Sequence, residues 1–340
     1  MRDDRSASAA LSTPSSSGRP PAAAERGSSA SGPHQLSARD WRAVLARTGR
    51  HVVSDQLPLQ SAGIAFFALL SIAPLFVTAL SVYGAVNTPE QARAQLSRLA
   101  DVLPTALEPV VADQLTTITT ASAQVLTVRG LTGLLVALWT ATTATTYLID
   151  ALTLAYHEGE TRSLLRRTGL ALVFVFGGAL LLGAVIAGAG VVSRALQRAP
   201  DAVGDAAGVL VWLGLAVLMA VVLAVLYRFA PDRRHARWRW TSWGAVAATA
   251  LWVATSVGLF AYVQGLGTYE STYGSLAGVA ISMFWLWITV LLVLAGATLN
   301  AEAERQSHHD STVGPERPVG ERGAVVADSV PPYPGEEQGR

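Results

Sequence analysis

The sequence contains no cysteine and no lysine, and it is poor in charge. The absence of cysteine excludes disulfides, thiolate catalysis and cysteine-ligated metal sites. Charged residues make up 14% of the 340 residues, against about 25% in an average soluble domain. Apolar residues make up 51%, so the composition favours an integral membrane protein over a pair of soluble domains. The net charge of +1 does not point to nucleic acid, and we expect no nucleic-acid partner.

The chain also lacks the motifs of common hydrolases and nucleotide-driven pumps. No P-loop, G-x-S-x-G or G-x-G-x-x-G stands in a suitable context. Metal-dependent RNA cleavage needs clustered His and Asp ligands, and no such cluster occurs in the sequence. The six histidines are scattered along the chain, at His34, His51, His157, His235, His308 and His309. We therefore expect no enzyme activity, no cofactor and no metal.

Both ends of the chain are rich in small and polar residues. Residues 1–36 and 307–340 hold too little apolar surface to offset chain entropy, so we predict that both tails are disordered. No secretory signal is visible near the N-terminus, because the first apolar run begins only at Ala62.

An amphipathic helix is predicted over residues 37–58. Ser37 to Asp40 has the pattern of a capping box, and Trp41, Val44 and Leu45 begin an apolar stripe flanked by arginines. Two interpretations stay open: the helix lies along the membrane surface, or it packs on the membrane domain itself.

Long uncharged runs dominate the rest of the chain. The longest of them separates Glu270 from Glu302 by 31 residues, and about 20 apolar residues suffice for a helix to cross a bilayer. The sequence predicts an all-α, polytopic membrane domain over residues 59–306. Its six transmembrane helices are expected at about 61–86, 130–156, 168–192, 206–229, 240–263 and 275–301.

The polar interval between the first two spans looks ordered. Thr88-Pro89-Glu90-Gln91 is typical of a helix start, and Pro104 separates two apolar faces. We predict a pair of amphipathic helices over 88–120 that caps the extracytoplasmic face.

The arginines indicate the orientation. Six spans place both termini on one side, and thirteen arginines near the spans lie on that side, against five on the other. By the positive-inside rule both termini are expected to be cytoplasmic.

Three blocks resemble the YihY/virulence factor BrkB family, formerly described as ribonuclease BN. AFFALLSIAP at 65–74 is similar to that family's A-[FY]-[FY]-x-L-x-S-x-x-P. LYRFAP at 226–231 and the stretch from Tyr269 to Asn300 supply the second and third blocks, and Leu152 to Ser163 is a weaker match. One departure matters, because the family's G-A-E-L-N has an acid where this chain has Thr298. No role of that carboxylate can be carried over, although Glu302 lies one turn further on.

The resemblance implies a six-helix protein of the bacterial cytoplasmic (inner) membrane, without a settled activity. It favours a translocator of an envelope component, lipid among the candidates. The alternative is a non-transporting scaffold for envelope assembly or resistance. The expected partner is the lipid bilayer, including anionic lipids, and the sequence leaves cargo, energy source and oligomeric state open.

A polar stripe on the second span is the candidate pathway. Thr142, Thr146 and Asp150 fall at i, i+4 and i+8 on one helix face, which Thr153 continues. An ionisable residue in a span suggests function, with Arg162 or water from the cytoplasm as the expected partner of Asp150. Two simpler explanations stay open. Threonine hydroxyls in membrane helices usually donate hydrogen bonds to carbonyls of their own helix, and Asp150 could simply be hydrated near the cytoplasmic end.

Other residues are expected to act in helix packing and lipid contact. Gly274-x-x-x-Gly278 lets helices approach closely, and Pro74 interrupts the first span and needs its neighbours there. The arginine cluster near the fifth span either binds anionic headgroups or only sets topology. It comprises Arg228, Arg233, Arg234 and Arg237.

Overall fold

The computed structural model is helical throughout its regular elements. It describes residue 28 and residues 30–54, 56–86, 123–196, 201–265 and 275–331. The elements are η2 (Pro33–Gln35), α1 (Ala38–Ser54), α2 (Leu57–Val86), α5 (Ala123–Ala155), α6 (Leu164–Leu196), α7 (Asp201–Phe229), α8 (Trp238–Gly265), α10 (Ser275–Arg305) and α11 (Val325–Asp328). The predicted outer helix pair at 88–120 and the tail residues 1–27 lie outside the described residues.

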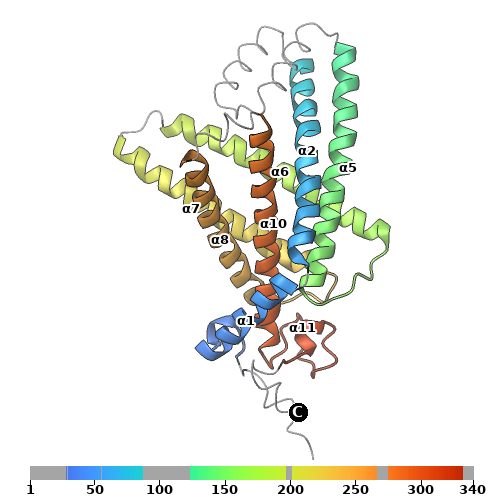
Figure 1. Cartoon of the computed structure of the whole chain (residues 1–340), viewed down its shortest axis with the longest axis vertical. Helices are drawn as coiled ribbons and strands as arrows, with labels where there is room; N and C mark the ends of the chain where they lie inside the picture. The colour runs from blue at the N-terminus through green and yellow to red at the C-terminus, as the bar shows by residue number, and fades with distance from the viewer. Residues whose placement is uncertain are drawn as a thin grey trace, which may run out of the picture.

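Within the part of the chain that the structure describes, six helices are long and apolar enough to cross a membrane, which confirms the predicted all-α membrane fold. Their spans are Leu57–Ala79, Thr127–Ala155, Leu164–Val192, Leu210–Phe229, Trp238–Val263 and Ala277–Arg305. Helices α2, α5 and α10 run side by side, whereas α6 and α7 slant behind them (Figure 1). Helix α10 is central, because it packs against α2, α8, α5 and α1.

Helices α2 and α5 have the most extensive contact, and Pro74 lies in it. Helix α2 continues through Pro74, and the Thr78 hydroxyl donates to the Pro74 carbonyl at 2.8 Å. A Cβ at Gly133 of α5 would lie 3.1 Å from that same carbonyl. The Pro74 carbonyl is therefore bonded by a hydroxyl of α2 itself and approached closely by a small residue of α5.

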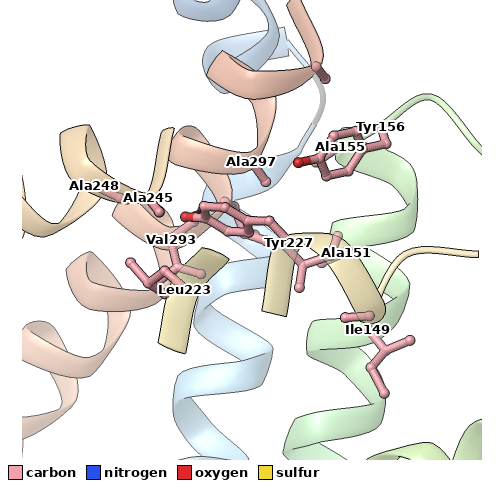
Figure 2. Packing of buried hydrophobic residues seen from close by; sticks show 14 of the residues in the cluster. Ile149, Ala151, Ala155, Tyr156, Leu223, Tyr227, Ala245, Ala248, Val293 and Ala297 are labelled. Carbon is pink, nitrogen blue, oxygen red and sulfur yellow. Dashed lines mark hydrogen bonds between the residues drawn. The ribbon is translucent and has the colours of Figure 1, made fainter. Parts of the chain in front are cut away.

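The buried core lies toward the end of the bundle where α1 and α11 are found. Tyr227 of α7 is enclosed by α8 and α10, and its hydroxyl donates to the Val293 carbonyl at 2.7 Å (Figure 2). Tyr156, directly after α5, fills the neighbouring space beside Ala297. These two phenols bring the ends of α5, α7 and α10 together.

Helix α1 packs on the membrane domain. Val44 is fully buried against Ala303 and Leu299 of α10, and the Trp41 ring lies 6.0 Å from that of Trp243 on α8. Of the two interpretations, contact with the membrane domain is the one that the structure supports, while Val53 on the opposite face is exposed.

Residues 307–331 differ from the predicted disordered tail. This segment, here called the C-terminal segment, returns along the ends of α7, α8 and α10. Ser311, Thr312 and Val326 are buried in it. Burial alone would raise the pKa of Asp310, but hydrogen bonds from Thr312 and Arg317 hold that pKa below its usual range. Polar contacts order the segment where its composition offers few apolar ones.

Candidate functional site

The upper part of the threonine stripe lines a cavity between α5 and α6. The cavity has a volume of about 460 Å³. Its lining includes Trp139, Thr142, Thr146 and Tyr147 of α5 with Thr168 of α6. Thr146 donates to the Thr142 carbonyl at 2.8 Å, as threonines in membrane helices commonly do. The Thr142 hydroxyl is buried and has no hydrogen-bond partner among the described residues.

Asp150 lines a second cavity, between α2 and α5. This cavity has a volume of about 320 Å³, and Gln60, Tyr147 and Asp150 are its polar lining residues. Tyr147 contributes to both cavities, the first of which lies between α5 and α6 and the second between α5 and α2. We call this pair of cavities the α5 groove.

Asp150 is paired, but not with the predicted residue. Arg167 of α6 donates to its two carboxylate oxygens at 3.0 and 3.2 Å. The expected partner Arg162 instead binds Asp232 at 3.1 Å and the carbonyls of Ala230 and Pro231. The prediction of Arg162 was wrong because the chain turns after α5, which carries Arg162 toward the end of α7.

Thr153, the last residue of the predicted stripe, does not line the α5 groove. It is buried, donates to the Ile149 carbonyl at 2.9 Å and accepts the Asp232 backbone N–H at 3.3 Å. Burial alone would raise the pKa of Asp232, but hydrogen bonds from Thr161 and the nearby Arg162 lower it below its usual range. Thr153 therefore belongs to the contact between the ends of α5 and α7.

The side chains of the arginine cluster contact other residues of this chain. Arg228 lies over the Trp238 ring at 4.5 Å, and Arg237 donates to the Thr312 carbonyl at 3.0 Å. The Arg234 side chain lies beside Gly314, and its backbone N–H donates to Gly323. Arg233 is buried. Contact with lipid headgroups stays a prediction for the cluster, and the C-terminal segment covers part of it.

Arg233 forms a buried ion pair with Glu304 of α10. Its Nη2 lies 2.8 and 3.0 Å from the two carboxylate oxygens, and its guanidinium stacks over the Tyr156 ring at 4.7 Å. Burial alone would lower the pKa of Arg233, but the paired Glu304 raises it above the ordinary value. Burial raises the pKa of the Tyr156 phenol as well. Both groups keep their usual charge states, so the contact is a permanent structural one.

A second set of polar residues gathers around Glu302, whose side chain is 0% exposed. Arg47 of α1 donates to Oε2 at 2.6 Å, and Arg305 donates to Oε1 at 2.8 Å. The Nε2 atoms of His51 and His157 lie 3.5 and 3.0 Å from that same Oε1. We call this set the polar junction; it consists of Arg47, His51, His157, Glu302 and Arg305.

The polar junction was missed by reading the sequence alone. Its two histidines are 106 residues apart, and Glu302 lies another 145 residues along the chain. Only Glu302 had a usable signal, because a carboxylate at the end of a long apolar helix needs a partner.

The structure describes one of the two glycines predicted to pack helices: Gly278 is half-buried in α10, and Gly274 lies outside the described residues.

The comparisons with known proteins agree on a family. The family model described as "Virulence factor BrkB" matches residues 48–321. A ribonuclease-like protein of Bacillus subtilis (strain 168), YfkH, is 28% identical over 71% of this chain and 88% of its own length.

Two UPF0761 membrane proteins are also similar. The one from Ralstonia nicotianae is 28% identical over 77% of this chain, and the one from Methylibium petroleiphilum is 25% identical over 79%. The chain spans 60% and 64% of those two relatives. The search of solved structures finds no match. With most of its length covered by the family model, the chain belongs to the virulence factor BrkB family of membrane proteins.

Proposed function

We propose that this protein translocates an amphiphilic envelope component, a lipid, along the α5 groove of the bacterial inner membrane. The single observation that carries the proposal is that two cavities share Tyr147 and are lined by Thr142, Thr146 and Asp150 of the polar stripe. Leu135 and Leu154 mark the extremes of the groove on α5, and 19 residues of helix correspond to about 28 Å. That length is most of the roughly 30 Å hydrocarbon core.

The chemistry of the groove suits a molecule with a polar head and apolar chains. Threonine and tyrosine hydroxyls offer hydrogen bonds, those of Thr142, Thr146 and Tyr147 among them, while leucines and a tryptophan supply the apolar lining. The unpartnered Thr142 hydroxyl is costly in an apolar environment unless a partner arrives. The Asp150–Arg167 ion pair, near the end of the groove, could exchange its internal contact for one with a charged headgroup.

Filling or neutralising the groove is expected to slow lipid transfer. Thr142→Leu removes a hydroxyl and fills space, and Asp150→Asn removes the charge that faces Arg167. We expect each variant to fold normally and to lower the transfer rate at least about tenfold, or about 1.4 kcal/mol on the barrier. The measurement is transfer of fluorescent phospholipids between the leaflets of vesicles containing the purified protein.

Thr132→Leu is the matched control, because Thr132 is an exposed residue of the same helix that does not line the groove. Its rate should equal that of the unaltered protein. If no variant changes the rate, or if vesicles with and without protein transfer lipid equally, the translocator proposal fails. The scaffold alternative would then be the better account.

The orientation assigned to the proposed translocator also makes a prediction. Because arginines concentrate at the end that carries α1 and the C-terminal segment, this end should face the cytoplasm. In the Cys-free chain, Ser97→Cys should react with a membrane-impermeant maleimide in intact cells. Arg234→Cys and Glu316→Cys should react only after the membrane is opened, and the reverse pattern would contradict the assignment.

A further inference from the structure

Three potential metal ligands from three separate elements meet in the polar junction. His51 belongs to α1, His157 follows α5, and Glu302 is in the last turns of α10. Their ligand atoms all lie within 4.8 Å of one another. Tetrahedral bonds of about 2.0–2.1 Å to one ion would place ligand atoms roughly 3.3 Å apart. The observed separations of 3.0 and 3.5 Å from Oε1 to the two imidazoles are close to that spacing.

The Glu302 carboxylate is held in place by its surroundings. Arg47 binds the other oxygen of Glu302, and Gln306 accepts from Arg47 at 2.6 Å while donating to Asp40 at 3.1 Å. Outer contacts of this kind orient ligating carboxylates in known metal sites.

His157 is fixed by its backbone. Its φ of +59° is uncommon for a residue other than glycine, and its N–H donates to the Leu154 carbonyl at 2.8 Å. The helix end thereby directs the ring toward Glu302, where it meets the His51 ring edge-on at 4.9 Å between centroids.

We propose that the polar junction binds a divalent transition-metal ion of the zinc type through His51 Nε2, His157 Nε2 and Glu302 Oε1. Two imidazoles and a carboxylate are ligands that Zn²⁺ accepts, whereas Mg²⁺ and Ca²⁺ prefer oxygen ligands alone. Three protein ligands leave a fourth position for water or an outside ligand. The ion would join α1 to the ends of α5 and α10, and this inference does not depend on the proposed function.

Arg305 is the cation that competes with such an ion. Its Nη1 lies 2.8 Å from Glu302 Oε1 and 3.4 Å from His157 Nε2, so it occupies the space between two ligands. Its Nε donates to Ser329 of the C-terminal segment at 3.0 Å. The side chain is one-fifth exposed and can swing outward. An entering ion would displace Arg305 and loosen its contact with the C-terminal segment.

The test is metal binding by the purified, tag-free protein after treatment with a chelator. Titration with Co²⁺, followed by its visible absorption, and Zn²⁺ competition should show one ion per chain. His51→Gln and His157→Gln should each weaken binding at least about tenfold. His235→Gln is the matched control and should bind as the unaltered protein does, because His235 is exposed and lies apart from the three ligands.

The Arg305→Gln variant separates a metal site from a purely structural cluster. Removing the competing guanidinium should tighten binding, whereas a cluster that only ties helices together would lose stability without gaining affinity. Thermal unfolding in the presence of chelator should show that the two histidine variants are folded. Absence of stoichiometric binding, or equal affinity in the three histidine variants, would overturn the proposal. Weaker binding by Arg305→Gln would contradict the displacement of Arg305.

Discussion

A methyl group added at Gly244 is expected to prevent the membrane domain from reaching its native packing. A Cβ at this position of α8 would overlap the Gly296 carbonyl of α10 and lie 2.6 Å from the Asn300 side chain. The reverse contact is also too close for a side chain, since a Cβ on Gly296 would lie 2.8 Å from the Gly244 carbonyl. Overpacking usually costs about 1–3 kcal/mol, and here the obstacle is backbone that has no alternative rotamer.

A hydrogen-bond network adds to the cost of separating these helices. The Gly244 N–H donates to Asn300 Oδ1 at 2.7 Å, and Asn300 Nδ2 donates to the Thr241 carbonyl at 3.0 Å. Asn300 is buried, so moving α8 away from α10 would leave its amide without partners. Gly244→Ala should therefore give aggregated protein, or protein with a melting temperature lowered by several degrees.

Gly258→Ala is the matched control in the same helix. No heavy atom lies within 4 Å of a Cβ built on Gly258, and alanine favours helix over glycine by about 1 kcal/mol. Size-exclusion profiles and thermal unfolding in detergent should therefore show no loss for Gly258→Ala. Equal behaviour of the two variants would mean that α8 and α10 are not in contact at Gly244.

Residue spacing within one helix predicts which residues share a face, but it does not predict which residues of two helices meet. The G-x-x-x-G pattern directed attention to Gly274 and Gly278, because such spacing places small residues on one helix face. The tightest described contact is between Gly244 and Gly296, one glycine from each helix, and no spacing within a single helix reveals such a pair. Gly296 and Asn300 do lie within the stretch that carries the family resemblance.

The six spans could be predicted because membrane insertion depends on local apolar length. The sites could be predicted only in part. The stripe from Thr142 to Asp150 could be predicted because all of its residues belong to one helix. The meeting of His51, His157 and Glu302 was not, since the positions of three elements determine it. The order in the C-terminal segment was missed for a related reason: composition counts apolar residues, whereas this segment is held by hydrogen bonds to buried partners.

Glu304→Leu is expected to destabilise the protein by about 3–5 kcal/mol, the usual cost of removing one partner from a buried ion pair. The Arg233 and Glu304 side chains are 2% and 1% exposed, so no water can replace the lost carboxylate without opening the structure. Ser311 of the C-terminal segment also donates to Glu304 Oε1. The segment should therefore become accessible to protease in this variant, at a denaturant concentration that leaves the unaltered protein intact.

The double variant Arg233→Met/Glu304→Leu tests the electrostatic reason for that loss. Well-packed apolar side chains often replace a buried ion pair at little cost, because both desolvation penalties disappear together. We expect the double variant to recover much of the stability that Glu304→Leu loses. Glu321→Gln is the control for losing one acidic residue of the C-terminal segment at an exposed site. If the double variant is as unstable as the sum of its single changes, the two residues act independently, and packing against Tyr156 rather than charge pairing holds Arg233 in place.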